Sequence, residues 1–199
     1  EALVHSARRR AAIATAQTLA TLHQIDKIIL AVPNSERAHW EAHPEFGLLS
    51  DRLQWDFDSP EIEFHFGKRI GEIVSRLALE RLLYIGAGSM PLLSRNQLAE
   101  VVGQLSRSGE RWAITNNLHS SDWLGITDAT VLPEAAAQLP RDNMLGWVLK
   151  HKAGFRLRAL PPSAATQLDI DTPTDLVALR WHPGTNAQLR SFVAERLPS

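Results

Sequence analysis

The chain has 199 residues, 44% of them hydrophobic, and a formal net charge of −1, so it is long enough for one hydrophobic core and we expect a single domain over 1–199. The near-neutral charge predicts no nucleic-acid partner and no membrane partner, and the absence of cysteine excludes disulfides, thiolate zinc sites and a cysteine nucleophile. No apolar run reaches the roughly 20 residues that span a bilayer, and Arg8, Arg9 and Arg10 interrupt the start before a signal sequence could form, so we expect a cytoplasmic protein.

The spacing of apolar residues predicts an alternation of helices and strands. The run 28–32 (IILAV) is continuous and rich in Ile and Val, which favours a buried parallel strand. Two capping boxes, Ser94 with Gln97 and Thr172 with Asp175, mark helix starts. Helices are expected at about 4–24, 35–39, 68–79, 95–106, 143–152, 173–181 and 186–197, strands at 28–32, 62–66, 81–85, 112–115 and 155–160, and a polar loop at 116–125.

Strands that alternate with helices are typical of a three-layer α/β fold with a mostly parallel central sheet. We expect residues 28–32, 81–85 and 112–115 to lie in that sheet. Ligands of such folds bind beyond the carboxyl ends of the strands. The segments that qualify by their position in the chain are 86–91, 116–122 and 169–172.

The first of these segments, GAGSMP, has no carboxylate, histidine or lysine. It matches neither a nucleophile elbow nor a dinucleotide fingerprint, because Ala87 and Pro91 stand where these motifs need glycine. Small residues in a tight turn allow a ligand to approach the backbone closely. The candidate cofactor-binding residues are therefore Gly86, Gly88, Ser89 and Pro91. A plain strand-to-helix turn explains the same residues equally well.

The last segment lies in LDIDTPTDL, at 168–176. Side chains alternate along an extended backbone, so Asp169 and Asp171 point to one side. Mg²⁺ takes oxygen ligands and is often held by one or two carboxylates together with phosphate. The two aspartates are therefore candidate catalytic and metal-binding residues. Alternatively, Asp171 only supports the helix start at Thr172, although this leaves Asp169 unexplained.

YIGAGSMPLLS at 84–94 and LDIDTPTDL resemble two halves of the MobA-like nucleotidyltransferases, which include molybdenum-cofactor and phospholactate guanylyltransferases. DNMLGWVLK at 142–150 and the EALV start extend the resemblance over most of the chain. The resemblance implies a Rossmann-like fold of the glycosyltransferase-A type. It also implies transfer of a nucleoside monophosphate from a nucleoside triphosphate to a small phosphorylated or hydroxylated acceptor, with release of pyrophosphate and with Mg²⁺ as cofactor.

The chain departs from this family pattern in two places. The family has an aspartate, a principal metal ligand, where this chain has Ser89, a weaker and neutral ligand. The family's glycine-rich nucleotide loop, with its arginine and lysine, would precede Glu1, so either it lies in a preceding segment or the protein lacks it. In the resembling fold the loop at 116–122 lies over the acceptor, which makes Asn117 and Asp122 candidate substrate contacts. A solvated polar turn is the alternative.

These observations lead to three hypotheses. The favoured one is a Mg²⁺-dependent nucleotidyltransferase in which Asp169 and Asp171 carry the metal. The second is a pseudoenzyme of the same fold that binds a nucleotide, a sugar phosphate or a partner protein without turnover. The third is a metal-independent relative that uses another chemistry at the same place. Because Ser89 replaces a charged ligand, we expect Mg²⁺ binding to be weak or absent.

Overall fold

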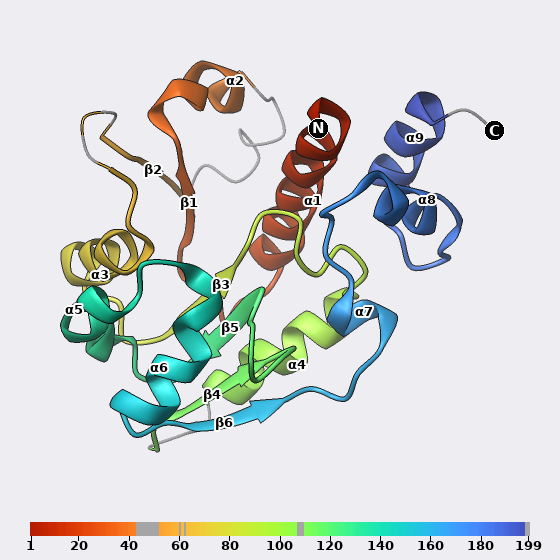
Figure 1. Ribbon diagram of the computed structural model, residues 1–199. Coiled ribbons are helices and arrows are strands. Elements are labelled where there is room, and N and C mark those ends of the chain that lie inside the picture. The colour runs from red at the N-terminus through yellow and green to blue at the C-terminus, as the bar shows by residue number, and fades with distance from the viewer. Residues whose placement is uncertain (43–51, 60, 62, 107–109, 198–199) are drawn as a thin grey trace.

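The computed structural model describes residues 1–42, 52–59, 61, 63–106 and 110–197 (Figure 1). Its α-helices are α1 (Ala2–Ala20), α2 (Arg37–Glu41), α3 (Phe66–Leu77), α4 (Arg95–Leu105), α5 (Leu132–Ala135), α6 (Leu145–Lys152), α7 (Ala164–Gln167), α8 (Pro173–Trp181) and α9 (Ala187–Arg196). Its strands are β1 (Ile28–Val32), β2 (Leu53–Phe57), β3 (Leu82–Ile85), β4 (Trp112–Thr115), β5 (Trp123–Ile126) and β6 (Arg156–Ala159). Short 3-10 helices are η1 (Asn34–Glu36), η3 (Ala129–Val131), η4 (Ala136–Gln138) and η5 (Asp142–Met144). Over the described ranges, no helix has the length and apolar character needed to cross a bilayer.

The described strands form a larger and a smaller sheet (Figure 1). The larger sheet has the order β3-β5-β4-β6, in which β5 is antiparallel to both neighbours and β4 is parallel to β6. In the smaller sheet β1 runs parallel to β2, from Ile28 opposite Leu53 to Val32 opposite Phe57. The α/β class is confirmed. In the larger sheet β3, β4 and β6 run in the same direction, as expected of a mostly parallel sheet, and β5 runs against them. The arrangement differs from the prediction in one respect, because β1 does not share a sheet with β3 and β4.

Two predictions of local structure are wrong. The strand expected at 62–66 is absent from residues 63–65, Phe66 begins α3, and position 62 lies outside the described residues. The strand in this region is instead β2, whose apolar and polar residues alternate just as regularly. The second error is the polar loop expected at 116–125, because its last part belongs to β5. All four residues of β5 are buried in the middle of the larger sheet.

The apolar strand β1 is less buried than its sequence predicts. Of its five residues only Ile28 is buried, and Ala31 is exposed. A strand in a two-stranded sheet is covered on fewer sides than a strand in the middle of a larger parallel sheet. In β4, by contrast, Ala113, Ile114 and Thr115 are each 0% exposed. Burial is therefore set by the position of a strand in its sheet rather than by its apolar content alone.

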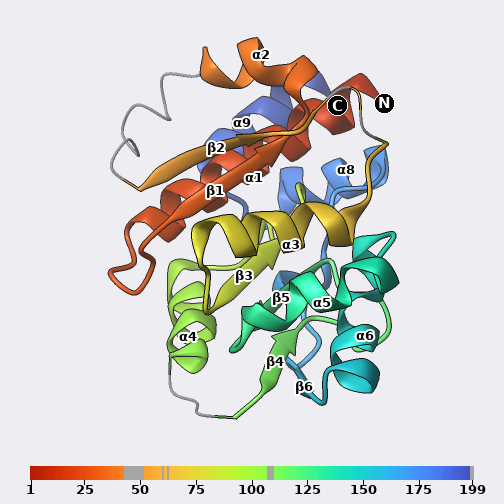
Figure 2. The same ribbon diagram turned by 90° about the vertical axis from the view of Figure 1, so that its left-hand side faces the viewer.

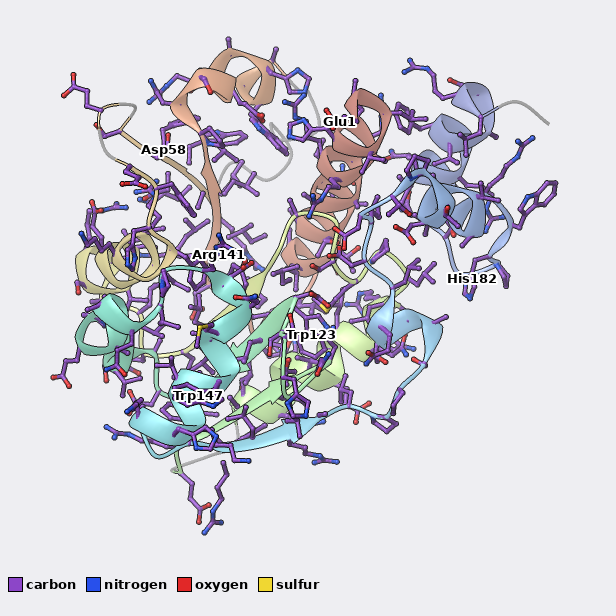
Figure 3. The ribbon with its side chains drawn as sticks, viewed as in Figure 1. Glu1, Asp58, Trp123, Arg141, Trp147 and His182 are labelled. Atoms are coloured by element: carbon purple, nitrogen blue, oxygen red, sulfur yellow. The ribbon has the colours of Figure 1, made fainter. Side chains whose placement is uncertain are left out.

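Helices cover both faces of the sheets and complete three layers (Figure 2). Neighbouring strand residues point to opposite faces: Ile114 packs with α1 and α4, whereas Ala113 packs with α3, α5 and α6. A third core joins α1 to α8 and α9. Trp123 lies in the middle of the molecule (Figure 3) and is 0% exposed, while Trp147 lies on the outside of α6 and is 44% exposed.

Local capping signals predicted two helix starts correctly. Ser94 accepts a hydrogen bond from the Gln97 N–H, and the Gln97 side chain reaches back to the Ser94 backbone, at the start of α4. Thr172 and Asp175 form the corresponding box at the start of α8. These bonds satisfy backbone groups that a helix terminus leaves unpaired. The first helix is shorter than predicted and ends at Ala20.

Candidate functional site

The turn after β3 and the segment before α8 meet in space, although they are far apart in the sequence (Figure 1). Ser89 and Asp169 form an isolated antiparallel β-bridge, and the Ile170 N–H donates to the Gly88 carbonyl oxygen at 3.3 Å. The meeting point lies past the carboxyl end of β3, where α/β folds bind ligands. We call it the bridge site and define it as residues 86–89, residues 169–171 and Arg8.

Close approach of other groups explains the glycines of the turn. Gly88 has a φ of 101°, a left-handed conformation that favours glycine. A Cβ atom at Gly88 would lie 2.9 Å from Cγ of Arg8 and 3.2 Å from Oδ1 of Asp169. A Cβ atom at Gly86 would lie 3.0 Å from the Asp122 carbonyl oxygen. Both glycines are therefore needed for the packing of the turn, whether or not a ligand approaches it.

Apolar residues anchor the far side of the turn. Met90, Leu92 and Leu93 are buried in the two cores that α1 shares with α4 and with α8. Pro91, which stands between them, is half-buried. The turn is thus packed firmly into the structure, and the ligand-binding role of Pro91 and the glycines stays a prediction.

Ser89 uses its hydroxyl within the protein. The residue is 3% exposed, and its Oγ donates to the Asp122 carbonyl oxygen at 3.1 Å. The Gly86 N–H donates to the same oxygen at 2.9 Å. The Asp122 carbonyl therefore ties the turn to the loop that precedes β5. The hydroxyl is buried and directs its proton to this carbonyl oxygen, so only its uncharged lone pairs remain for another partner.

The two predicted catalytic carboxylates have different surroundings. Asp169 is half-buried, and its Oδ1 accepts a hydrogen bond from the Ile170 N–H at 2.9 Å. Burial raises the pKa of Asp169 to about 6, and the negative charge of Asp171 is the second cause. The Asp171 side chain is 65% exposed and lies 3.6 Å from the Arg8 guanidinium. Asp169 therefore holds its negative charge at neutral pH in unfavourable surroundings.

Arg8 is a residue of the site that the sequence interpretation missed. Its Nε donates to the Ala87 carbonyl oxygen at 2.8 Å, and a terminal nitrogen faces Asp171. A cavity of about 430 Å³ lies beside it, lined by the first two turns of α1, Asp171 and Pro173. The sequence shows a run of three arginines at 8–10, but only the packing of α1 decides which of them faces the turn.

Asn117 is occupied by contacts within its own loop. Its side-chain oxygen accepts a hydrogen bond from the His119 N–H at 2.9 Å, and its carbonyl oxygen accepts one from the Ser121 hydroxyl at 2.8 Å. These bonds shape the connection between β4 and β5. The predicted role of Asn117 as a substrate contact stays a prediction.

Asp122 lies closer to the bridge site and has partners that the sequence did not reveal. The buried Asn116 donates from Nδ2 to Oδ2 of Asp122 at 2.6 Å. Nearby, the Tyr84 hydroxyl donates to Oδ2 of Asp142 at 2.7 Å. Burial, followed by this hydrogen bond and the charges of Asp142, Asp122 and Asp169, raises the pKa of Tyr84 well above its usual value. The ends of β3 and β4 therefore share one negatively charged neighbourhood.

These side chains do not form a ready-made site for a divalent cation. Within the described part of the chain, no group of three or more His, Cys, Asp or Glu side chains is placed to hold a metal ion. Ser89 directs its hydroxyl to a carbonyl oxygen, and Asp171 faces Arg8. The two carboxylates of the bridge site would need the phosphates of a ligand to complete the coordination of Mg²⁺.

A second hollow, of about 530 Å³, lies between α2, β2 and α3. Here the buried Asp56 forms ion pairs with Arg69 and Arg76. The Arg37 guanidinium stacks over the Phe57 ring, 3.6 Å from its centroid. Acidic and basic groups in this hollow are matched to one another. At the bridge site the acidic groups are not matched by basic ones, and we therefore place the candidate functional site there.

Comparison with known proteins defines the class of fold. No family model matches the chain, and no curated protein matches it. Among solved structures, the chain is similar to a cytidylyltransferase from Leptospira borgpetersenii serovar Hardjo-bovis (strain JB197), with a TM-score of 0.55 and 13% sequence identity. The match covers 86% of this chain and 77% of the other. The chain thus shares the α/β fold of that nucleotidyltransferase, and its resemblance to the MobA-like family stays a prediction.

Proposed function

We propose that the chain is a nucleotidyltransferase-like protein that binds a nucleoside triphosphate at the bridge site. The observation that carries this proposal is the bridge between Ser89 and Asp169, which joins the two segments that resemble nucleotidyltransferase motifs. The similarity of fold to a cytidylyltransferase supports it. The acceptor is a small phosphorylated or hydroxylated molecule.

In the proposed reaction an oxygen of the acceptor forms a bond to the α-phosphorus of the triphosphate. The bond from this phosphorus to the bridging oxygen of the β-phosphate breaks, and pyrophosphate leaves. Asp169 and Asp171 are the proposed metal-binding and catalytic residues, with Mg²⁺ offsetting phosphate charge when bound. Asp122 and Asn117 are the proposed acceptor contacts, and residues 86–91 provide the close backbone approach.

A specific observation favours a second candidate, a pseudoenzyme that binds the nucleotide without turnover. The position that resembles the family's metal ligand is a serine whose hydroxyl is held by the Asp122 carbonyl oxygen. Both candidates require nucleotide binding, and they differ in pyrophosphate release. Equilibrium binding and turnover must therefore be measured separately.

The binding test uses equilibrium dialysis of the purified chain against each common nucleoside triphosphate, compared with Gly88→Ala. A Cβ atom at Gly88 meets Arg8 and Asp169, so this variant should weaken binding by about tenfold or more, the equivalent of roughly 1.4 kcal/mol. Gly103→Ala is the matched control, because a Cβ atom there has nothing within 4 Å. Circular dichroism checks that both variants are folded.

Binding of one triphosphate to the unaltered chain and to Gly103→Ala, with loss in Gly88→Ala, would support the proposal. No binding by the unaltered chain, or equal binding by a folded Gly88→Ala, would refute it. Release of pyrophosphate on addition of phosphorylated or hydroxylated acceptors then separates the enzyme from the pseudoenzyme.

A further inference from the structure

The first helix distributes its basic side chains among different partners. Arg9 forms an ion pair with Glu36, with NH2 and Oε1 2.8 Å apart, and His5 lies 3.7 Å from the same carboxylate. Arg10 stacks over an aromatic ring of α9, 4.6 Å from its centroid. Arg8 is the basic side chain that α1 directs to the bridge site. Its placement is therefore distinct from that of its neighbours in the sequence.

The Arg8 guanidinium touches both halves of the bridge site. Its Nε donates to the Ala87 carbonyl oxygen at 2.8 Å on the turn, and NH2 lies 3.6 Å from Oδ1 of Asp171 on the other half. A Cβ atom at Gly88 would be 3.0 Å from Nε of Arg8 and 3.2 Å from Oδ1 of Asp169. The guanidinium and the Asp169 carboxylate therefore flank the same glycine.

We propose that Arg8 is a built-in cation that takes the place of a divalent metal ion at the bridge site. Its guanidinium supplies positive charge to Asp169 and Asp171, and it thereby weakens the binding of Mg²⁺ or Mn²⁺. A triphosphate at this site contacts the guanidinium, which is suited to phosphate oxygens, so its binding does not depend on a divalent ion, whereas the proposed turnover still uses Mg²⁺. This last part rests on the proposed function, whereas the effect of Arg8 on metal binding does not.

The physical reason is repulsion between like charges. A dication bound to the two carboxylates would lie close to the guanidinium, and at a separation of about 5 Å in water their repulsion would weaken metal binding roughly tenfold or more. Ser89 adds no negative charge to oppose this effect, because its side chain is a neutral hydroxyl. A tethered guanidinium is also present in every molecule, whatever the concentration of metal.

The test is a titration with Mn²⁺, which prefers the same oxygen ligands as Mg²⁺, followed by electron paramagnetic resonance of the free ion. We expect weak binding by the unaltered chain and an affinity about tenfold or more higher in Arg8→Gln. The double variant Arg8→Gln with Asp169→Asn should lose the gain. Arg8→Lys keeps the charge and should bind Mn²⁺ as weakly as the unaltered chain, as should the control Arg10→Gln on the same helix.

Tight Mn²⁺ binding by the unaltered chain, no gain in a folded Arg8→Gln, or a gain that survives Asp169→Asn would overturn the proposal. Dialysis against a triphosphate with and without EDTA tests the nucleotide part. The unaltered chain should bind equally in both conditions, and a need for the metal would contradict that part. If no triphosphate binds to any variant in either condition, the proposed function fails, while the Mn²⁺ titration still decides the role of Arg8.

Discussion

Two clusters in this protein pair arginine with aspartate, and they differ in the balance of charge. Between β2 and α3, two guanidinium groups, those of Arg69 and Arg76, share the buried carboxylate of Asp56. At the bridge site one guanidinium, that of Arg8, serves the two carboxylates of Asp169 and Asp171. In the first cluster the buried carboxylate is fully compensated by its cationic partners, whereas in the second the two carboxylates outnumber their one cationic partner.

This difference separates a structural cluster from the candidate functional site. A buried carboxylate with two cationic partners is fully compensated, so its loss would leave charges without partners inside the protein. A half-buried carboxylate with a raised pKa and a shared partner keeps an unfavourable charge, which is a common property of binding and catalytic sites. Substitutions at the two clusters should therefore have opposite effects on stability.

The largest effect is expected from Asp56→Ala. Removing this carboxylate leaves Arg69 and Arg76 without their buried counter-ion, and breaking such a cluster typically costs about 3 kcal/mol or more of unfolding free energy. Urea unfolding at neutral pH measures the loss. Asp26→Asn is the control, because Asp26 is exposed in the loop before β1. A loss below about 1 kcal/mol would show that the cluster is not structural.

Ser89→Asp should cost somewhat less, about 2 kcal/mol. The site is buried, and an ionised carboxylate there would face the Asp122 carbonyl oxygen without a proton to donate. Thermal unfolding of Ser89→Asp against Ser89→Ala separates the added charge from the lost hydrogen bond. The carboxylate introduced by Ser89→Asp should also raise the affinity for Mn²⁺ if Asp169 contacts the same ion. Unchanged metal affinity would instead identify the turn as purely structural.

Asp169→Asn should stabilise the protein above pH 6. The pKa of Asp169 is raised from 3.8 to about 6, so the folded state binds a proton more readily than the unfolded state. Stability therefore falls as pH rises from about 4 to about 6, and the variant avoids this loss. Allowing for partial exposure to solvent, we expect a gain of about 1–2 kcal/mol at pH 7 and none below pH 4.

Urea unfolding of Asp169→Asn across this range of pH gives the measurement. The charged groups that face Asp169 are Asp171, Asp122 and Arg8, and Arg8 is the one that favours its negative charge. In an Arg8→Gln background, Asp169→Asn should therefore stabilise the protein by a larger amount. A gain that is the same at pH 4 and pH 7 would attribute the effect to packing rather than to charge.

Asp171→Asn should have the smallest effect on stability, within about 0.5 kcal/mol at neutral pH. The side chain lies 3.6 Å from Arg8 and is 65% exposed. Because of this exposure, solvent screens the ion pair. Thermal unfolding of Asp171→Asn and of the unaltered chain, in low and in high salt, measures this change in stability. A larger loss that disappears in high salt would show that the Arg8 pair stabilises the bridge site more than its exposure suggests.

Several parts of the fold could be read from local sequence because their causes are local. The capping boxes of Ser94 and Thr172 rest on residues three positions apart, and both were predicted correctly. The bounds of β1 and β4 follow from short apolar runs and were also correct. The pair of β2 and residues 62–66 shows the limit: both segments alternate, and only pairing with β1 selects β2.

The sequence by itself determined the α/β class, most helices and the two segments of the bridge site, because periodicity, caps and short motifs depend on neighbouring residues. Only the tertiary structure decided that β5 is a buried central strand, since its burial comes from β3 and β4 on either side. It likewise decided that Ser89 donates to a carbonyl oxygen and that Arg8 faces Asp171. Such contacts join residues far apart in the chain, so their distances and charges arise only when the helices and strands pack together.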